Sequence, residues 1–117
     1  MRYYRCIMVG IDIVAIERFK KIKKEDRDAW RSTFTNSEWG YAFEGSDPAS
    51  RLAGIYAGKE AVMKAVGAEI MGKFDRIDIV HTPERRPLVQ LSEHAPSSVS
   101  VSIAHDGGFA IAVATLD

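Results

Sequence analysis

The fold is decided by Arg51-Leu-Ala-Gly-Ile-Tyr-Ala-Gly-Lys-Glu-Ala-Val-Met-Lys-Ala-Val-Gly67. At about 100° per residue, the larger apolar side chains of this stretch fall on one stripe, which is the periodicity of a helix packed on a core. The stripe consists of Leu52, Ile55, Tyr56, Val62, Met63 and Val66. Alanines at positions 53, 57 and 61 form a column beside it that lets another backbone approach closely. The pattern predicts one long central helix.

Three charged residues interrupt this helix. Lys59 falls inside the apolar stripe, so its ammonium either finds a partner or extends along the apolar surface to reach water. Glu60 and Lys64 stand one turn apart at the border of the stripe, in the order that favours an ordinary helical ion pair worth about 0.2–0.5 kcal/mol. Taken alone, the helix is more typical of a structural element than of a catalytic one.

The composition is that of a soluble globular protein, with 117 residues, 46% of them hydrophobic and 27% charged. This length predicts one domain over residues 1–117. Sixteen basic residues balance sixteen acidic ones, which argues against general binding of nucleic acid. No apolar run reaches the roughly 18 residues of a membrane span. The single cysteine, Cys6, fits a reducing compartment, and we therefore expect a cytoplasmic protein.

An aspartate interrupts the first apolar segment. Residues from Tyr3 to Ile16 are rich in β-branched and apolar types and predict a strand buried on both faces. An ionised Asp12 in such surroundings needs a cation, a metal or several hydrogen-bond donors. Asp12 would equally suit the end of the strand, where it would cap the next helix. The residues themselves leave these two interpretations about equal.

A basic segment follows the strand, and its pattern from Ala15 to Trp30 predicts an amphipathic helix. The exposed basic residues are Arg18, Lys20, Lys21, Lys23 and Lys24. Such a run is usually a solvated face, but it also suits the docking of an acidic partner. Because no aromatic residues are interleaved with the lysines to stack on bases, an acidic protein is favoured over nucleic acid.

Two further helix starts are indicated. Thr35 and Glu38 have the spacing of a capping box, which predicts a short aromatic helix behind them. Asp47 or Ser46, followed by Pro48, suits the start of the central helix.

The last third of the chain alternates with period two. Residues 74–80 and 87–91 predict a hairpin with one solvent-exposed face. Residues 98–116 predict a second hairpin that turns at Asp106-Gly107-Gly108, with His105 at the end of its first strand. We therefore expect an α+β fold, in which a long central helix packs on an antiparallel sheet with short helices on its flank.

The charged residues in unusual places favour phosphate chemistry. The sequence has no zinc-type Cys/His spacing, Walker-type glycine loop or nucleophile elbow. It does have the carboxylates Asp12 and Glu60, the lysines Lys59 and Lys64, and His105. Two carboxylates suit a hard divalent ion, usually Mg²⁺, that is shared with phosphate oxygens, and lysines add positive charge around such a group. The set predicts a phosphate-bearing substrate.

Three blocks of sequence carry a resemblance to a known family. They are Gly10-Ile-Asp12-Ile-Val14, Leu52-Ala-Gly-Ile-Tyr-Ala-Gly-Lys-Glu-Ala-Val-Met-Lys64 and Val101-Ser-Ile-Ala-His105. In order, spacing and total length they resemble the short, single-domain 4′-phosphopantetheinyl transferases, the holo-[acyl-carrier-protein] synthase type, and the resemblance covers nearly the whole chain. It implies Mg²⁺-dependent transfer of 4′-phosphopantetheine from coenzyme A to a serine hydroxyl of apo acyl carrier protein, with release of 3′,5′-ADP.

The resemblance also implies a role for individual residues. Asp12 and Glu60 match the metal-binding carboxylates, and together with Lys64, near the transferred phosphate, they form the implied catalytic set. The residues assigned to coenzyme A are Lys59, Lys64, His105 and Arg51. Those assigned to docking of the acidic carrier protein are Arg18, Lys20, Lys21 and Lys24. The serine proton leaves to Glu60 or to a metal-bound water, and the family implies a homotrimer with sites at its subunit interfaces.

Some positions depart from the family pattern. Ile55 stands where many members have an arginine, which removes a phosphate or inter-subunit contact, and Gly58 stands where alanine is common. The rival interpretation is a non-catalytic module that docks an acidic protein through residues 18–24. The carrier protein itself, and whether it serves fatty-acid or secondary metabolism, stay open.

Overall fold

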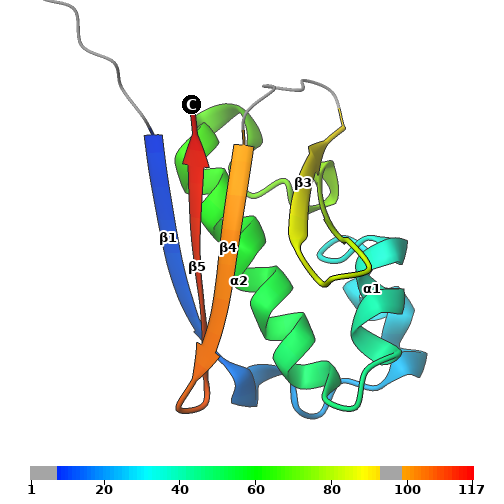
Figure 1. Ribbon diagram of the computed structural model, residues 1–117. Coiled ribbons are helices and arrows are strands. Elements are labelled where there is room, and N and C mark those ends of the chain that lie inside the picture. Colours follow the sequence, from blue (N-terminus) through cyan, green and yellow to red (C-terminus); the bar gives the residue numbers. More distant parts are fainter. Residues whose placement is uncertain (1–7, 93–98) are drawn as a thin grey trace, which may run out of the picture.

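Helix α2, Pro48–Val66, is the axis of the fold (Figure 1). The computed structural model describes residues 8–92 and 99–117. An antiparallel sheet of order β1-β5-β4 covers one side of α2 and consists of β1 Met8–Ala15, β4 Val99–Asp106 and β5 Phe109–Leu116. Helix α1, Asn36–Phe43, and a hairpin of β2, Ile77–His81, and β3, Pro87–Leu91, cover its other side. The expected α+β arrangement is confirmed, and so are both predicted hairpins.

Helix α2 begins three residues before the stretch quoted first. Asp47 is its N-cap: the carboxylate accepts from the Ser50 backbone nitrogen at 3.3 Å and from the Ser50 hydroxyl at 2.6 Å. Pro48 occupies the first turn, where its missing N–H costs nothing. Gly67 ends the helix at a φ of 111°, a conformation that favours glycine. Of the two caps considered, Asp47 is therefore the one used.

The core is formed by large side chains of α2 that meet small ones of the sheet. Leu52, Ile55, Val62 and Met63 are each at most 1% exposed, as the stripe predicts. The inward side of β5 carries alanines: Ala110, Ala112 and Ala114. Because these side chains are short, α2 lies close to the sheet.

The opposite side of the sheet carries the larger residues and is not covered by any part of the chain that the structure describes. We call it the apolar face, and its members are Val9, Ile11, Ile13, Phe109, Ile111 and Val113. Ile13 is 61% exposed and Phe109 is 48% exposed. The prediction that the first strand is buried on both faces is thus wrong for β1 within a single chain. Apolar composition alone does not say whether another element covers each face of a strand. Residues 3–7 of that prediction lie outside the described residues.

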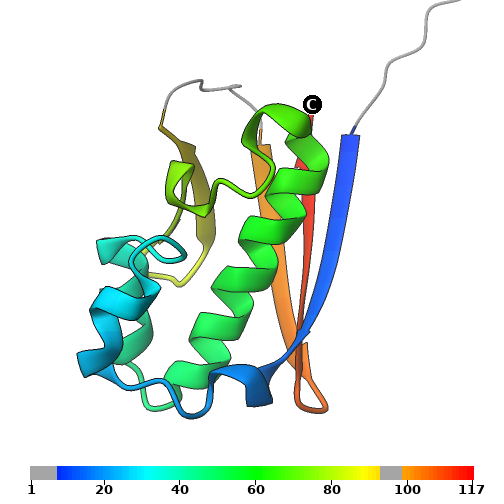
Figure 2. The ribbon, with the colours of Figure 1, turned by 180° about the vertical axis from the view of Figure 1, so that it is seen from behind.

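The predicted amphipathic helix of residues 15–30 is also wrong. Two short 3-10 helices replace it, η1, Ile16–Phe19, and η2, Lys24–Trp30. Figure 2 shows the chain leave β1, pass the N-terminal end of α2 as η1, and reach η2 beside α1. Phe19 packs on Trp30 and Phe34 at ring distances of 6.2 and 6.3 Å, so the segment bends where a continuous helix would hold its ends apart. The run of like charges also disfavours an uninterrupted helix.

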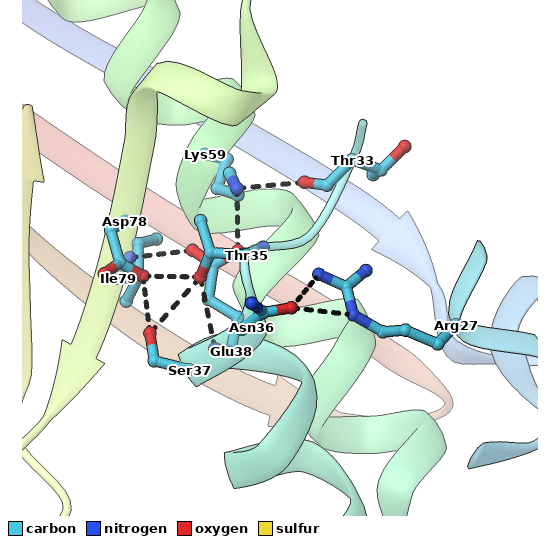
Figure 3. Close-up of polar contacts among 9 residues, drawn as sticks. All are labelled: Arg27, Thr33, Thr35, Asn36, Ser37, Glu38, Lys59, Asp78 and Ile79. Carbon is cyan, nitrogen blue, oxygen red and sulfur yellow. Dashed lines mark hydrogen bonds and ion pairs between the residues drawn. The ribbon is translucent and has the colours of Figure 1, made fainter. Parts of the chain in front are cut away.

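Lys59 meets a buried carboxylate inside the protein (Figure 3). Its Nζ lies 2.7 Å from Oε1 of Glu38, and both side chains are 0% exposed. The ammonium also donates to the Thr33 carbonyl at 2.9 Å. The second oxygen of Glu38 accepts from the Ile79 backbone nitrogen at 2.7 Å, so this pair ties α2 to α1 and β2. The alternative in which Lys59 reaches the surface is therefore wrong.

The predicted capping box holds Glu38 in place. The Thr35 hydroxyl accepts from the Glu38 backbone nitrogen at 3.2 Å, and the Glu38 carboxylate accepts from the Thr35 nitrogen at 2.9 Å. The same hydroxyl donates to Asp78 of β2 at 2.6 Å. A single side chain thus closes the helix start and bonds it to the neighbouring strand.

Burial works against the charges of this pair. It raises the pKa of Glu38 and lowers the pKa of Lys59, while their mutual attraction and hydrogen bond oppose both shifts. Transfer of both ions from water cancels much of their attraction, so the pair adds little net stability. Removal of one partner, in contrast, leaves an uncompensated ion in the core.

We therefore expect Lys59→Met to lower the free energy of unfolding by about 3–5 kcal/mol. The double variant Lys59→Met/Glu38→Gln should recover part of this loss, because a neutral amide can still accept from Ile79. Urea denaturation measures both, with Lys73→Met, at an exposed position, as the control. Equal losses in the single and double variants would contradict an unpaired charge as the cause.

Candidate functional site

Asp12 of β1 and Lys64 of α2 come together at one edge of the sheet. The Lys64 ammonium donates to the Ile11 carbonyl at 2.9 Å and lies 3.4 Å from Oδ1 of Asp12. Asp12 stands in mid-strand, opposite Ala112, and caps no helix. Of the two interpretations of Asp12, the one that requires a cation is therefore confirmed.

Gly10 permits this approach. A Cβ at this position would lie 2.0 Å from the Ala61 carbonyl oxygen and 2.8 Å from the Ala65 nitrogen. The backbone of α2 thus lies directly on β1, and the close contact admits no side chain. This contact places the part of α2 around Lys64 beside the strand that carries Asp12.

Glu60 stands one turn before Lys64 and is half-buried. The ordinary helical ion pair between them does not form, because Lys64 turns to Asp12. Within residues 8–92 and 99–117, the Glu60 carboxylate makes no hydrogen bond or ion pair, and only Oδ1 of Asp12 is engaged. Carboxylate oxygens on both residues therefore remain available to an incoming cation.

This donor set fits one kind of metal. In the described part of the chain, no three His, Cys, Asp or Glu side chains gather as a metal-binding group. An all-protein cage, as for structural zinc or calcium, is therefore not built from those residues. Magnesium usually takes one or two carboxylates and completes its shell with water and substrate phosphates. Asp12 and Glu60 match that requirement.

A pocket of about 230 Å³ lies beside Asp12 and Lys64, and its lining is partly polar and partly apolar. Asp12 and Lys64 supply its polar groups, and its walls are Ile11, Ile13 and Ile111. All three isoleucines belong to the apolar face. Whatever covers that face also encloses the charged pair.

A second pocket, of about 190 Å³, lies at the N-terminal end of α2. Arg51 and His105 both line it. His105 Nε2 lies 2.8 Å from the Ser50 carbonyl, which can only accept, so this nitrogen carries the proton. A Cβ on Gly54 would come within 2.8 Å of the same nitrogen, so this glycine makes room for the ring. Along the helix axis, Arg51 and Lys64 are separated by about 20 Å, at about 1.5 Å per residue.

An aromatic stack orients Arg51 in this second pocket. Arg51 donates to the Tyr41 carbonyl at 2.7 Å, and its guanidinium lies 4.2 Å from the centre of the Tyr41 ring. Tyr41 in turn stacks on His81, with the ring centres 3.9 Å apart and 3° between the planes. Burial, and then the nearby Arg51, lower the pKa of His81, so its ring is neutral at pH 7.

The structure brings together some of the expected site residues and separates others. Asp12 and Lys64 meet beside the C-terminal half of α2, with Glu60 one helical turn before Lys64, and Arg51 and His105 line the pocket at the N-terminal end. Lys59 reaches neither pocket, because it is buried against Glu38, so its sequence-based assignment to coenzyme A does not hold in this geometry.

The basic residues assigned to docking lie in the sharp bend formed by η1, the chain behind it and the start of η2. The exposed residues are Arg18, Lys20, Lys21 and Lys24. The Arg18 guanidinium lies 5.1 Å from the centre of the Tyr56 ring, and Lys20 pairs with Glu17 at 3.2 Å. They form an exposed cluster, although not the helix that the sequence suggested.

The sequence did not indicate three polar residues of the second pocket: Tyr41, His81 and Arg85. Tyr41 belongs to the short aromatic helix predicted behind the capping box, for which the sequence indicated no role in binding. His81 ends a strand, as His105 does, and that shared position was the one available signal. Arg85 lies in a turn whose conformation no pattern revealed.

Comparison with known proteins gives the family. The model of the 4′-phosphopantetheinyl transferase superfamily matches residues 8–114. This chain belongs to that superfamily. The expected family resemblance and fold are thereby confirmed.

Relatives in the superfamily match over nearly the whole chain. A holo-[acyl-carrier-protein] synthase of Sulfurovum sp. (strain NBC37-1) is 36% identical over 116 residues, which cover 93% of this chain and 95% of that protein. The crystal structure of Helicobacter pylori holo-[acyl-carrier-protein] synthase in complex with coenzyme A has a TM-score of 0.76 and 37% identity, and covers 92% of this chain and 97% of that one. The Neisseria meningitidis synthase has a TM-score of 0.77 at 26% identity, covering 94% and 97%.

Among residues 8–92 and 99–117, no helix has the length and apolar character that crossing a membrane requires.

Gly10→Ala should push α2 away from β1. Overpacking of this kind costs about 1–3 kcal/mol of unfolding free energy. The matched control is Gly40→Ala, because a Cβ at Gly40 of α1 meets nothing within 4 Å. An alanine there should be neutral or stabilise the helix by up to about 1 kcal/mol. Chemical denaturation of both variants tests the contrast, and similar midpoints would refute close packing at Gly10.

Proposed function

We propose that this member of the superfamily transfers 4′-phosphopantetheine from coenzyme A to a serine hydroxyl of an apo acyl carrier protein and releases 3′,5′-ADP. The observation that carries the proposal is the contact of Lys64 with Asp12 at 3.4 Å, with the carboxylate of Glu60, which has no partner among the described residues, one helical turn before Lys64. Two carboxylates and an ammonium suit a diphosphate under attack. The relatives named above are holo-[acyl-carrier-protein] synthases, one of them solved with coenzyme A.

In the proposed reaction the serine oxygen forms a bond to the phosphorus that bears pantetheine. The bond from that phosphorus to the bridging oxygen of the diphosphate breaks, and 3′,5′-ADP leaves with the electron pair. Negative charge develops on the phosphoryl oxygens, where the Lys64 ammonium, held by the Ile11 carbonyl and Asp12, supplies fixed positive charge. Glu60 is the candidate base of this chain, because its half-buried carboxylate has no other partner among the described residues.

Asp12 and Glu60 would also hold Mg²⁺. When bound, the ion supplies charge neutralisation for the diphosphate. Arg51 and His105 are proposed to bind the nucleotide part of coenzyme A in the second pocket, where Arg51 is already oriented by Tyr41. The compact array of donors suits phosphate oxygens.

The proposal includes a homotrimer with sites at its interfaces. The apolar face is its support, because six large apolar side chains on one exposed sheet surface are unusual for a protein that stays alone. Ile11, Ile13 and Ile111 also line the Asp12–Lys64 pocket, so a second copy on this face would complete that pocket.

The carrier protein is proposed to dock on the exposed basic cluster of Arg18, Lys20, Lys21 and Lys24. Carrier proteins of this kind are acidic, so opposite charges would steer the encounter. A cytoplasmic location is also part of the proposal, since the chain has one cysteine and so no internal disulfide. A non-catalytic docking module would share the basic cluster but would not require the available carboxylate oxygens of Asp12 and Glu60.

Incubation with apo acyl carrier protein, coenzyme A and Mg²⁺ should add the mass of phosphopantetheine to the carrier. Glu60→Gln should reduce the turnover by at least about 100-fold, the range for loss of a positioned base. Glu69→Gln, which changes an exposed glutamate, is the matched control and should keep full activity. Mass spectrometry of the carrier measures all three. If several carriers gain no mass, with Mn²⁺ also tried, the transferase proposal fails and the docking module is favoured.

Val113→Lys should break the proposed trimer. This residue lies on the central strand of the apolar face and does not line the Asp12 pocket, so the change places a charge in the interface alone. Leu88→Lys, an exposed apolar residue of β3, is the control and should keep the assembly. Size-exclusion chromatography with light scattering should give trimers for the native protein and the control, and monomers for Val113→Lys. A native monomer would contradict the assembly.

A further inference from the structure

The turn between β2 and β3 holds an arginine in a conformation that usually requires glycine. Arg85 has a φ of 68°, the one positive value at a non-glycine position among the described residues. Its nitrogen donates to the Thr82 carbonyl at 2.7 Å, and the Thr82 nitrogen donates to the Arg86 carbonyl at 3.0 Å. This is a tight turn followed by a left-handed residue, the position at which hairpins usually use glycine.

The geometry of the turn therefore does not explain why residue 85 is an arginine. A left-handed conformation costs a non-glycine residue roughly 1–2 kcal/mol, and glycine would complete the same hydrogen bonds without that cost. Residues held in strained backbone conformations are concentrated at active sites, ligand-binding sites and switch regions.

The side chain of Arg85 lines the second pocket, with Arg51, His81 and His105. None of the described residues that line this pocket is acidic. Arg51 is oriented by Tyr41, whereas the exposed guanidinium of Arg85 makes no hydrogen bond or ion pair within residues 8–92 and 99–117. The pocket thus has one cation fixed by the protein and one that is available to a ligand.

The floor of the same pocket is apolar. Ile55 of α2 is one of its lining residues, and Ile103 of β4 is another. The charged groups of the pocket are therefore the guanidinium groups of Arg51 and Arg85, which lie beside apolar side chains.

We propose that Arg85 binds the phosphate monoester on the ribose of coenzyme A. This inference rests on the proposed function. That function assigns the diphosphate to the cluster of Asp12, Glu60 and Lys64, and the ribose monoester is the other anion of coenzyme A. A guanidinium can donate two parallel hydrogen bonds to a phosphate, which a single ammonium cannot. In the proposed trimer, the pocket of one chain and the charged cluster of its neighbour can serve one coenzyme A molecule.

The test is the binding of two ligands, coenzyme A and 3′-dephospho-coenzyme A, to native protein, Arg85→Gly and Arg86→Ala. Arg85→Gly should weaken the binding of coenzyme A by roughly 10- to 100-fold, the loss of a charge-assisted hydrogen bond, and leave the dephospho form nearly unchanged. Its melting temperature should stay the same or rise, because glycine relieves the left-handed strain, so unfolding cannot account for weaker binding. Arg86→Ala, which changes the adjacent arginine outside this pocket, should keep the native preference.

Calorimetry supplies the dissociation constants. Equal weakening for both ligands, or none for either, would overturn the role of Arg85. That failure is separate from failure of the proposed function, in which native protein would bind no coenzyme A and modify no carrier.

Discussion

The direct contact of α2 with β1 is the constraint on which the rest of the structure depends. At Gly10 the helix backbone lies so close to the strand that even one methyl group would overlap the Ala61 carbonyl. The alanines of β5 continue this close fit across the sheet. As a result, Lys64 of the helix reaches both the backbone and the side chain of the strand, at Ile11 and Asp12. The charged site is a direct consequence of small residues at the packing surface.

The opposite side of α2 is held by a different force. There Lys59 and Glu38 form an ion pair that is fully removed from water and bonded to the backbone of β2. Apolar contacts alone are non-directional, and the hairpin could slide on them. The hydrogen bonds that Glu38 accepts from the Ile79 nitrogen and from the Lys59 ammonium are directional, so the pair defines where β2 stands relative to α2 and α1. It thereby also positions His81 at the end of that strand, in the second pocket.

The two ends of α2 carry different chemistry. The end near Lys64 carries carboxylates and an ammonium beside the apolar face, where a second copy would exclude water. The end near Arg51 carries cations and stacked rings in an open pocket. A coenzyme with a diphosphate and a separate phosphate monoester requires both kinds of surface, which is the physical link between the proposed reaction and the proposed role of the β2–β3 turn.

Local pattern was sufficient where neighbours in sequence decide the outcome. The α2 stripe, the capping box of Thr35 and Glu38, and the turn at Gly107-Gly108 were all predicted, because each depends on periodicity or on a side chain within a few residues. The motifs also indicated Asp12 and Lys64 as members of one site. Only the tertiary structure decided that Lys59 meets Glu38, that Lys64 turns from Glu60 to Asp12, and that the large side chains of β1 and β5 face outward. Those outcomes depend on which distant element packs opposite each residue, and composition and spacing along one chain do not encode that choice locally.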